Sequence, residues 1–156
     1  MTTHVLVPID GSPLSTKALE VALTDYPDAE VTVLHVMDPI GAGFSIVDVM
    51  RPKFGDGAPP GSVTEEYWAE WYDSSHERAE SLFEAARETA AAYDATVQTV
   101  TDVGDPATEI VAYADEHGVD RIVMGSHGRS GAKRLFLGSV AETVARRARV
   151  PVTIVH

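Results

Sequence analysis

A glycine-rich stretch in the last third of the sequence has the composition of a phosphate-binding loop. Residues 125–139 read GSHGRSGAKRLFLGS, between a short apolar run and a run with the apolar spacing of a helix. Glycine at the end of a strand permits positive φ and a close approach of a ligand to the backbone. Gly138 and Ser139 stand where the helix begins, and unpaired amides and a positive dipole end favour an anion there. The pattern predicts a phosphate site, with a loop that only turns the chain as the alternative.

Basic side chains gather in the same part of the chain. Residues 121–156 carry a net charge of +6 and residues 1–120 carry −18, with histidine neutral. Within the loop, Arg129, Lys133 and Arg134 would add cationic charge to the backbone amides. The total charge of −12 argues against a general nucleic-acid binder, because the phosphate backbone would be repelled.

Several other kinds of site are absent from the sequence. A Walker A loop needs adjacent lysine and hydroxyl residues, whereas Lys133 stands between Ala132 and Arg134. No G-x-G-x-x-G fingerprint and no G-x-S-x-G nucleophile elbow is present. The absence of cysteine excludes disulfides, thiol nucleophiles and cysteine-based metal sites. The loop is therefore a different kind of phosphate cradle.

The elements that must position this loop alternate between strand and helix patterns. Continuous apolar runs are typical of strands that are buried on both faces of a parallel sheet. The alternation predicts βαβ units, a parallel sheet and helices on both faces, which is an α/β fold. The predicted strands are residues 5–9, 31–37, 96–100, 122–124 and 151–155, and the predicted helices are 13–26, 65–93, 106–117 and one that starts near 140.

Capping residues mark the ends of two helices. Ser12 and Pro13 fit the N-cap and first position of one helix, and Asp105 and Pro106 fit those of another. Gly118 is expected to end the second of these helices.

The long acidic helix predicted over residues 65–93 carries two further signals. Ser74 and Glu77 match a capping box, which predicts that the helix breaks and restarts near Asp73. The aromatic residues of its first part are interpreted as a hydrophobic stripe against the sheet or a partner, with stacking on a base as the alternative; they are Trp68, Trp71 and Tyr72.

Residues 38–62 are rich in glycine and proline and connect the second predicted strand to this helix. A connection of this length inside a compact domain is unusual, and it is commonly either a functional lid or disordered. Both interpretations stay open.

Asp10 follows the first strand, at the edge where open α/β sheets bind their ligands. By residue type alone it is a turn or capping residue. Its position at this edge of the sheet supports a second interpretation, in which it contacts a ligand.

The spacing of the loop resembles a known signature. Gly125, Gly128 and Gly138-Ser139 fit G-x2-G-x9-G-[S/T], which is typical of the nucleotide-binding branch of the universal stress protein family. Residues 5–15, VLVPIDGSPLS, are similar to the same family, and the resemblance runs from His4 to His156. It implies one Rossmann-like domain over residues 1–156, of the adenine nucleotide alpha hydrolase-like type, with strand order 3-2-1-4-5. Strands one and four would then flank the switch point, so that Asp10 and Gly125 share one crevice.

The resemblance also implies a ligand and the residues that hold it. The ligand is ATP, and Mg²⁺ would arrive with it and contact Asp10, as in sites where this ion keeps several waters. His127 lies at a variable position, where it could donate to a phosphate, act as a weak base or face solvent. No residue is identified as catalytic, so the expected activity is at most slow ATP hydrolysis. The implied cofactor-binding residues are Pro8, Ile9, Asp10, Val36, Met124, Gly125, His127, Gly128, Arg129, Gly138, Ser139 and Val140.

The function implied by the resemblance is that of a nucleotide-responsive regulatory module in the stress response. The last strand, Val152 to Val155, is expected to pair with a second copy in a homodimer. A cytoplasmic location is expected, because no signal peptide pattern and no membrane span is present. The alternatives are an interaction protein of the same fold with an empty pocket and a flavodoxin-like FMN carrier. The acidic composition with only three lysines raises a further hypothesis, adaptation to concentrated salt.

Overall fold

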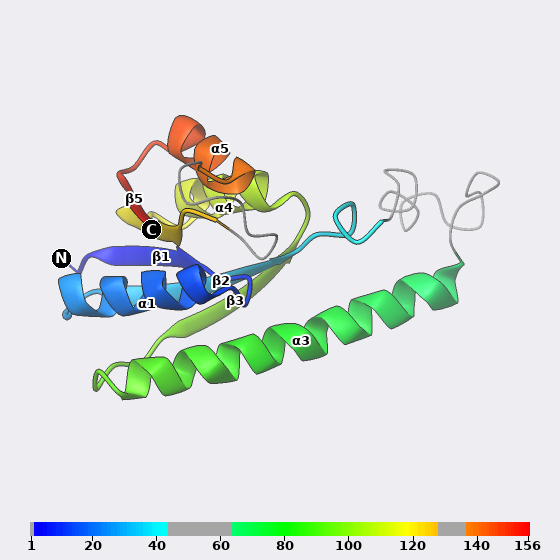
Figure 1. Cartoon of the computed structure of the whole chain (residues 1–156), viewed down its shortest axis with the longest axis horizontal. Helices are drawn as coiled ribbons and strands as arrows, with labels where there is room; N and C mark the ends of the chain where they lie inside the picture. The colour runs from blue at the N-terminus through cyan, green and yellow to red at the C-terminus, as the bar shows by residue number, and fades with distance from the viewer. Residues whose placement is uncertain (1, 44–63, 128–136) are drawn as a thin grey trace.

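The computed structural model describes residues 2–43, 64–127 and 137–156 (Figure 1). The elements in these ranges are β1 (His4–Pro8), α1 (Pro13–Asp25), β2 (Glu30–Met37), α3 (Glu65–Ala91), β3 (Gln98–Val103), α4 (Pro106–Glu116), β4 (Arg121–Gly125), α5 (Ser139–Arg147) and β5 (Val152–Val155).

The strands form a five-stranded sheet in the order β3-β2-β1-β4-β5, and each neighbouring pair is parallel. The predicted fold class and strand order are confirmed. β1 is central, with β2 and β4 on its two sides. The order reverses at this point, so the carboxyl ends of β1 and β4 frame a crevice.

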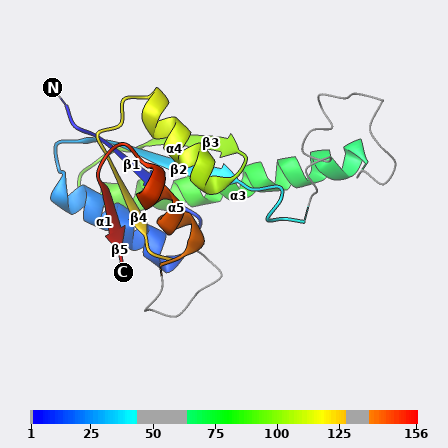
Figure 2. The same cartoon turned by 90° about the horizontal axis from the view of Figure 1, so that it is seen from above.

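Helices cover both faces of the sheet. α1 and α3 lie on one face, and α4 and α5 lie on the other (Figures 1 and 2). Val5, Leu6 and Val7 of β1 are fully buried, because successive side chains of the strand enter the two opposite cores. This explains why the strands read as continuous apolar runs in the sequence.

The predicted caps are confirmed. The Ser12 hydroxyl accepts a hydrogen bond from the amide of Ser15 at 3.2 Å, and Pro13 is the first residue of α1. The Asp105 carboxylate accepts from the amide of Thr108 at 3.1 Å and caps α4 in the same way. Gly118 follows the last turn of α4 at a φ of +62°, where glycine avoids strain.

The predicted break in the long helix is wrong. α3 is continuous past Asp73, and the hydroxyl of Ser74 donates to the carbonyl of Glu70 at 2.5 Å. A serine inside a helix can form this bond to the carbonyl four residues earlier, which lets the helix continue. Thr64 is the residue that caps α3, by accepting from the amide of Tyr67 at 3.1 Å.

Only the second half of α3 is anchored in the core, while its first half extends past the end of the sheet (Figures 1 and 2). Trp68 and Trp71 contact each other on this extension, with ring centroids 5.3 Å apart. The buried residues of α3 are Ala79, Phe83, Ala86 and Ala90.

β3 lies two to three residues later in the chain than its predicted range of 96–100. It pairs with β2 from Thr32 opposite Gln98 to Met37 opposite Val103, and this register fixes its bounds. Its expected position at the edge of the sheet is confirmed. Most of the predicted 38–62 connection lies outside the described residues. In the part of the chain that the structure describes, no helix has the length and apolar character needed to cross a membrane.

Candidate functional site

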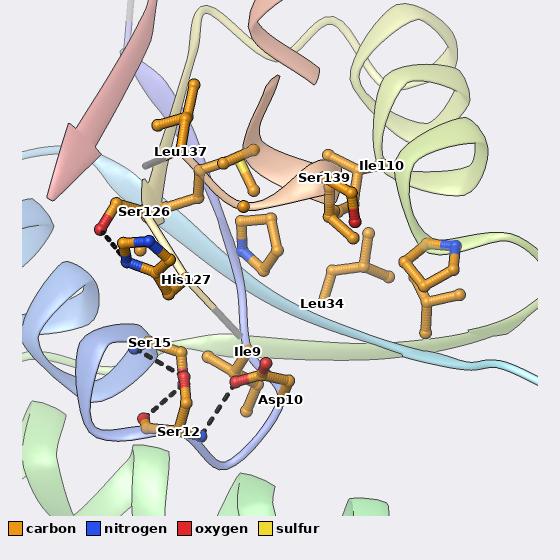
Figure 3. Close-up of a pocket in the computed structure, with 18 residues that line it drawn as sticks. Ile9, Asp10, Ser12, Ser15, Leu34, Ile110, Ser126, His127, Leu137 and Ser139 are labelled. Atoms are coloured by element: carbon orange, nitrogen blue, oxygen red, sulfur yellow. Dashed lines mark hydrogen bonds between the residues drawn. The ribbon is translucent and has the colours of Figure 1, made fainter. Parts of the chain in front are cut away.

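A pocket of about 400 Å³ opens at the carboxyl ends of β1 and β4 (Figure 3). This volume lies in the range of small-molecule binding sites. The described residues that line it are Pro8, Ile9, Asp10, Ser12, Ser15, Leu34, Val36, Pro106, Ile110, Met124, Gly125, Ser126, His127, Leu137, Gly138, Ser139, Val140 and Ala141.

One side of the pocket is apolar. Leu34 and Val36 of β2, Ile110 of α4 and Met124 of β4 contribute to it. Three of these side chains belong to the buried core between the sheet and helices α4 and α5, and Val36 packs against that core. The wall is therefore held by the packing of three elements and suits a flat apolar group such as a nucleobase.

The turn between β1 and α1 forms a polar part of the lining. The Asp10 carboxylate accepts from the amide of Ser12 at 2.9 Å, which orders the entry to α1. The imidazole Nδ1–H of His35 donates to the carbonyl of Ile9 at 2.9 Å, and the amide of Ile9 donates to Leu34 at 2.8 Å. The backbone of Ile9, which precedes Asp10, is therefore held by hydrogen bonds to β2.

The first turn of α5 lies at the pocket and has no side-chain cap. Gly138 is the N-cap residue and has no side chain with which to accept a hydrogen bond. Helices α1, α3 and α4 each have a hydroxyl or carboxylate in this role. The first amides of α5 are thus available to an acceptor from outside the helix, and the positive end of the helix dipole favours an anion there.

Ser126 and His127 directly follow β4 and lie beside Gly138 at the N-terminus of α5. Ser126 is 1% exposed; its amide donates to Val155 at 2.8 Å and its carbonyl accepts from Gly138 at 2.7 Å. Its hydroxyl lies 3.0 Å from Nδ1 of His127. The other ring nitrogen of His127, Nε2, is buried and has no hydrogen-bond partner among the described residues.

The positive φ expected of the loop glycines is not found at Gly125 or Gly138. Their contact with a ligand stays a prediction. A Cβ at Gly125 would lie 2.9 Å from the Cβ of Leu14, and a Cβ at Gly138 would lie 2.9 Å from the carbonyl oxygen of Ser126. Both glycines are required by close packing of the protein against itself.

The structure brings together ten of the twelve predicted cofactor-binding residues, all in the lining of this pocket. The other two, Gly128 and Arg129, lie outside the described residues, as do Lys133 and Arg134. Trp68, Trp71 and Tyr72 are not among the described lining residues, so the structure gives no support to stacking on a base in this pocket.

Sequence reasoning did not assign several lining residues to the site. Ser126 could have been found, since it stands inside the glycine signature. The α4 residues carried no signal beyond the apolar face of a helix, because only the fold directs that face to the pocket. The unassigned residues are Ser12, Ser15, Leu34, Pro106, Ile110, Ser126, Leu137 and Ala141.

The site offers little to a metal ion held by the protein alone. No group of three or more metal-ligating side chains is found in the described ranges. Asp10 is the one carboxylate among the described lining residues. This donor set fits an ion such as Mg²⁺ that keeps water and shares ligand phosphates, rather than a dedicated protein cage.

The family model and the related sequences that match this chain indicate the same family. The family model described as "Universal stress protein family" matches residues 1–156. Universal stress protein YxiE of Bacillus subtilis is 34% identical, with all of both chains covered. Universal stress protein MJ0577 of Methanocaldococcus jannaschii is 32% identical, over 99% of this chain and 95% of the relative.

Solved structures agree with this result. The structure of MJ0577 superposes with a TM-score of 0.77 at 29% identity, covering 99% of this chain and 96% of the other. A universal stress protein solved in complex with cAMP superposes with a TM-score of 0.61 at 25% identity, with coverage of 99% and 96%.

Proposed function

The chain belongs to the universal stress protein family, and from this premise we propose that it binds an adenine nucleotide, ATP with Mg²⁺, in the pocket between β1 and β4. Residues 1–156 act as one domain in this proposal, and the bound nucleotide makes it a regulatory module of the stress response. The observation that carries the proposal is the combination, in one pocket, of an apolar wall and an uncapped helix terminus.

The two parts of the pocket suit the two parts of a nucleotide. The base would lie against Val36 and Ile110, where burial of a flat aromatic surface is favourable. The phosphates would lie at the first turn of α5, where Gly138, Ser139 and Val140 supply amides and Ser139 also supplies a hydroxyl. A relative of this family has been solved with cAMP, which supports an adenine nucleotide as the class of ligand.

Mg²⁺ would be held mainly by the phosphates, with Asp10 as the protein ligand. One oxygen of Asp10 accepts from Ser12, so the carboxylate is held in place by the turn. The metal would neutralise phosphate charge in the pocket. We assign no residue as a base for an attacking water, so hydrolysis is expected to be slow.

A homodimer through β5 is part of the same proposal. β5 is an edge strand of the sheet, paired with β4 on one side. Edge strands present unpaired amides and carbonyls that can pair with another chain. A cytoplasmic location is also proposed, and the lack of cysteine suits a reducing compartment.

The decisive experiment is to purify the protein without added nucleotide, denature it and separate the released small molecules by ion exchange. Calorimetric titrations of the emptied protein with Mg-ATP, AMP, cAMP and Mg-GTP would follow. ATP or ADP released at about one per chain, or saturable binding of Mg-ATP in preference to Mg-GTP, supports the proposal. No adenine nucleotide in either experiment would overturn it in favour of an interaction protein with an empty pocket, and a yellow protein would indicate the FMN carrier.

A further inference from the structure

The backbone of Ser126 is fixed from two directions. Its amide is bonded to β5 through Val155, and its carbonyl accepts from Gly138 at the start of α5. The residue is 1% exposed, so solvent does not supply partners for its side chain. The hydroxyl of Ser126 therefore has a fixed environment, in which its proton needs an acceptor.

The one acceptor within reach of that proton, among the described residues, is Nδ1 of His127 at 3.0 Å. A neutral imidazole has one protonated and one unprotonated nitrogen, and the hydrogen bond at one nitrogen determines the state of the other. If Nδ1 carried the proton, the buried hydroxyl proton of Ser126 would have no acceptor. Leaving such a buried group unpaired lowers the stability of the folded protein. The arrangement that avoids this cost has Nδ1 accepting and Nε2 protonated.

The Nε2–H group produced in this way is itself unpaired. Nε2 is buried and has no partner among the described residues, although His127 lines the pocket. A buried donor without an acceptor is expected to be satisfied by a ligand or an ordered water. The nearby first turn of α5 presents backbone amides that no capping side chain accepts from, because Gly138 has no side chain. A ligand oxygen that carries no proton would accept from these amides and from Nε2–H.

We propose that Ser126 is a positioning residue that selects the Nε2–H tautomer of His127, and that this N–H donates to a phosphate oxygen of the ligand beside the α5 terminus. The inference rests on the proposed function for the identity of the ligand, while the tautomer is a property of the protein without ligand. His127 then acts as a neutral directional donor, and a general base is not required of it.

Two substitutions of His127 separate the two ring nitrogens. His127→Gln places an amide N–H near the position of Nε2 and keeps the donor. His127→Asn places its amide near the position of Nδ1 and lacks a donor at the outer position. We expect His127→Asn to weaken Mg-ATP binding about 10-fold, a loss of about 1.4 kcal/mol, and His127→Gln to stay within about 3-fold of the wild type. Adenosine, which has no phosphate, is expected to bind all three proteins equally.

The tautomer is measured without any nucleotide. Long-range ¹H–¹⁵N spectra of the emptied protein in mildly alkaline solution distinguish the two neutral tautomers of His127 by the shifts of the ring nitrogens. We expect the Nε2–H pattern in the wild type and an averaged pattern in Ser126→Ala. An Nδ1–H pattern in the wild type, or a Ser126→Ala spectrum identical to that of the wild type, would overturn the inference.

Titration of the same sample with inorganic phosphate, and separately with Mg-ATP, identifies the source of the phosphate oxygen. Movement of the Nε2 resonance with Mg-ATP supports the inference together with the proposed function. Movement with inorganic phosphate alone supports the donor role but contradicts the nucleotide proposal. Equal Mg-ATP affinity in the wild type and in His127→Asn contradicts the donor role while the nucleotide proposal stands.

Discussion

Gly125 at the end of β4 lies against Leu14 of α1 so closely that a Cβ at Gly125 would stand 2.9 Å from the Cβ of Leu14 and 3.0 Å from its carbonyl carbon. The first glycine of the loop signature therefore serves the packing of a helix on the sheet. Its φ is not in the region that only glycine favours. A residue that was expected to serve the ligand has a structural role as well.

Gly125→Ala is predicted to lower the free energy of unfolding by about 1–3 kcal/mol, because the new methyl group meets backbone atoms that cannot move aside easily. Urea denaturation measures the change. Gly118→Asn is the matched control: Gly118 has a φ of +62° and open space around it, and asparagine tolerates this conformation. Equal stabilities of Gly125→Ala and the wild type would show that the contact between Gly125 and Leu14 of α1 has room for a methyl group.

Gly138→Glu is predicted to weaken Mg-ATP binding at least 10-fold, since it places a carboxylate where the phosphates would lie. The added Cβ also meets the carbonyl oxygen of Ser126 at 2.9 Å, so some stability is lost as well. Gly138→Ala has the same Cβ without the charge and separates the two effects. Calorimetric titration is expected to find binding in Gly138→Ala. Equal affinity of Gly138→Glu and Gly138→Ala for Mg-ATP would show that the phosphates do not bind at this position.

Glu109→Gln is predicted to change how stability depends on pH. Burial raises the pKa of Glu109 above its ordinary value, and the negative charges of Asp102, Glu116 and Asp105 raise this pKa further. The folded state therefore binds the proton more tightly than the unfolded state, and this group lowers stability as the pH rises through its folded pKa. The unfolding free energy of Glu109→Gln minus that of the wild type should thus increase between about pH 4 and 7. Urea denaturation across this range tests the sign, and a difference that is constant or falls with pH contradicts it.

Phe83→Ala is predicted to destabilise the protein by about 3–5 kcal/mol, because Phe83 is 4% exposed and anchors the second half of α3 to the core. Tyr72→Ala, on the extension of the same helix, is expected to cost less than about 1 kcal/mol, since Tyr72 is 39% exposed. Thermal denaturation followed by circular dichroism compares the two. Similar losses for both variants would mean that the extension contributes as much as the anchored half.

Ile154→Pro is predicted to convert the proposed homodimer to a monomer. The carbonyl of Pro151 accepts from Ile122 of β4, and that of Val155 accepts from Ser126, which directly follows β4. By alternation the backbone groups of Ile154 therefore point to the outer edge of the sheet. Proline removes an outward amide there without removing a bond to β4. Light scattering after size-exclusion chromatography measures the mass, and circular dichroism checks the fold. A monomeric wild type, or a dimeric Ile154→Pro variant, would contradict pairing through β5.

Features that depend on local chemistry follow from the sequence alone. The caps at Ser12 and Asp105, the helix end at Gly118 and the continuous burial of β1 all follow from residues within one turn or one strand of each other. The resemblance added the strand order, which no local pattern contains. It also named ten residues that line the pocket, from segments more than 100 positions apart in the chain.

Contacts between elements that are distant in the chain set the role of individual residues. Ser74 was expected to start a helix, yet its hydroxyl has an acceptor inside α3 and the helix continues. Gly125 and Gly138 owe their identity to the contacts with Leu14 and Ser126, which come from other elements. Ser126 is bonded to β5 and to the start of α5, and no local pattern contains these partners. Nε2 of His127, beside it, is buried without a partner among the described residues. Local sequence determines the elements, whereas partners distant in the chain determine burial and the hydrogen bonds that remain open to a ligand.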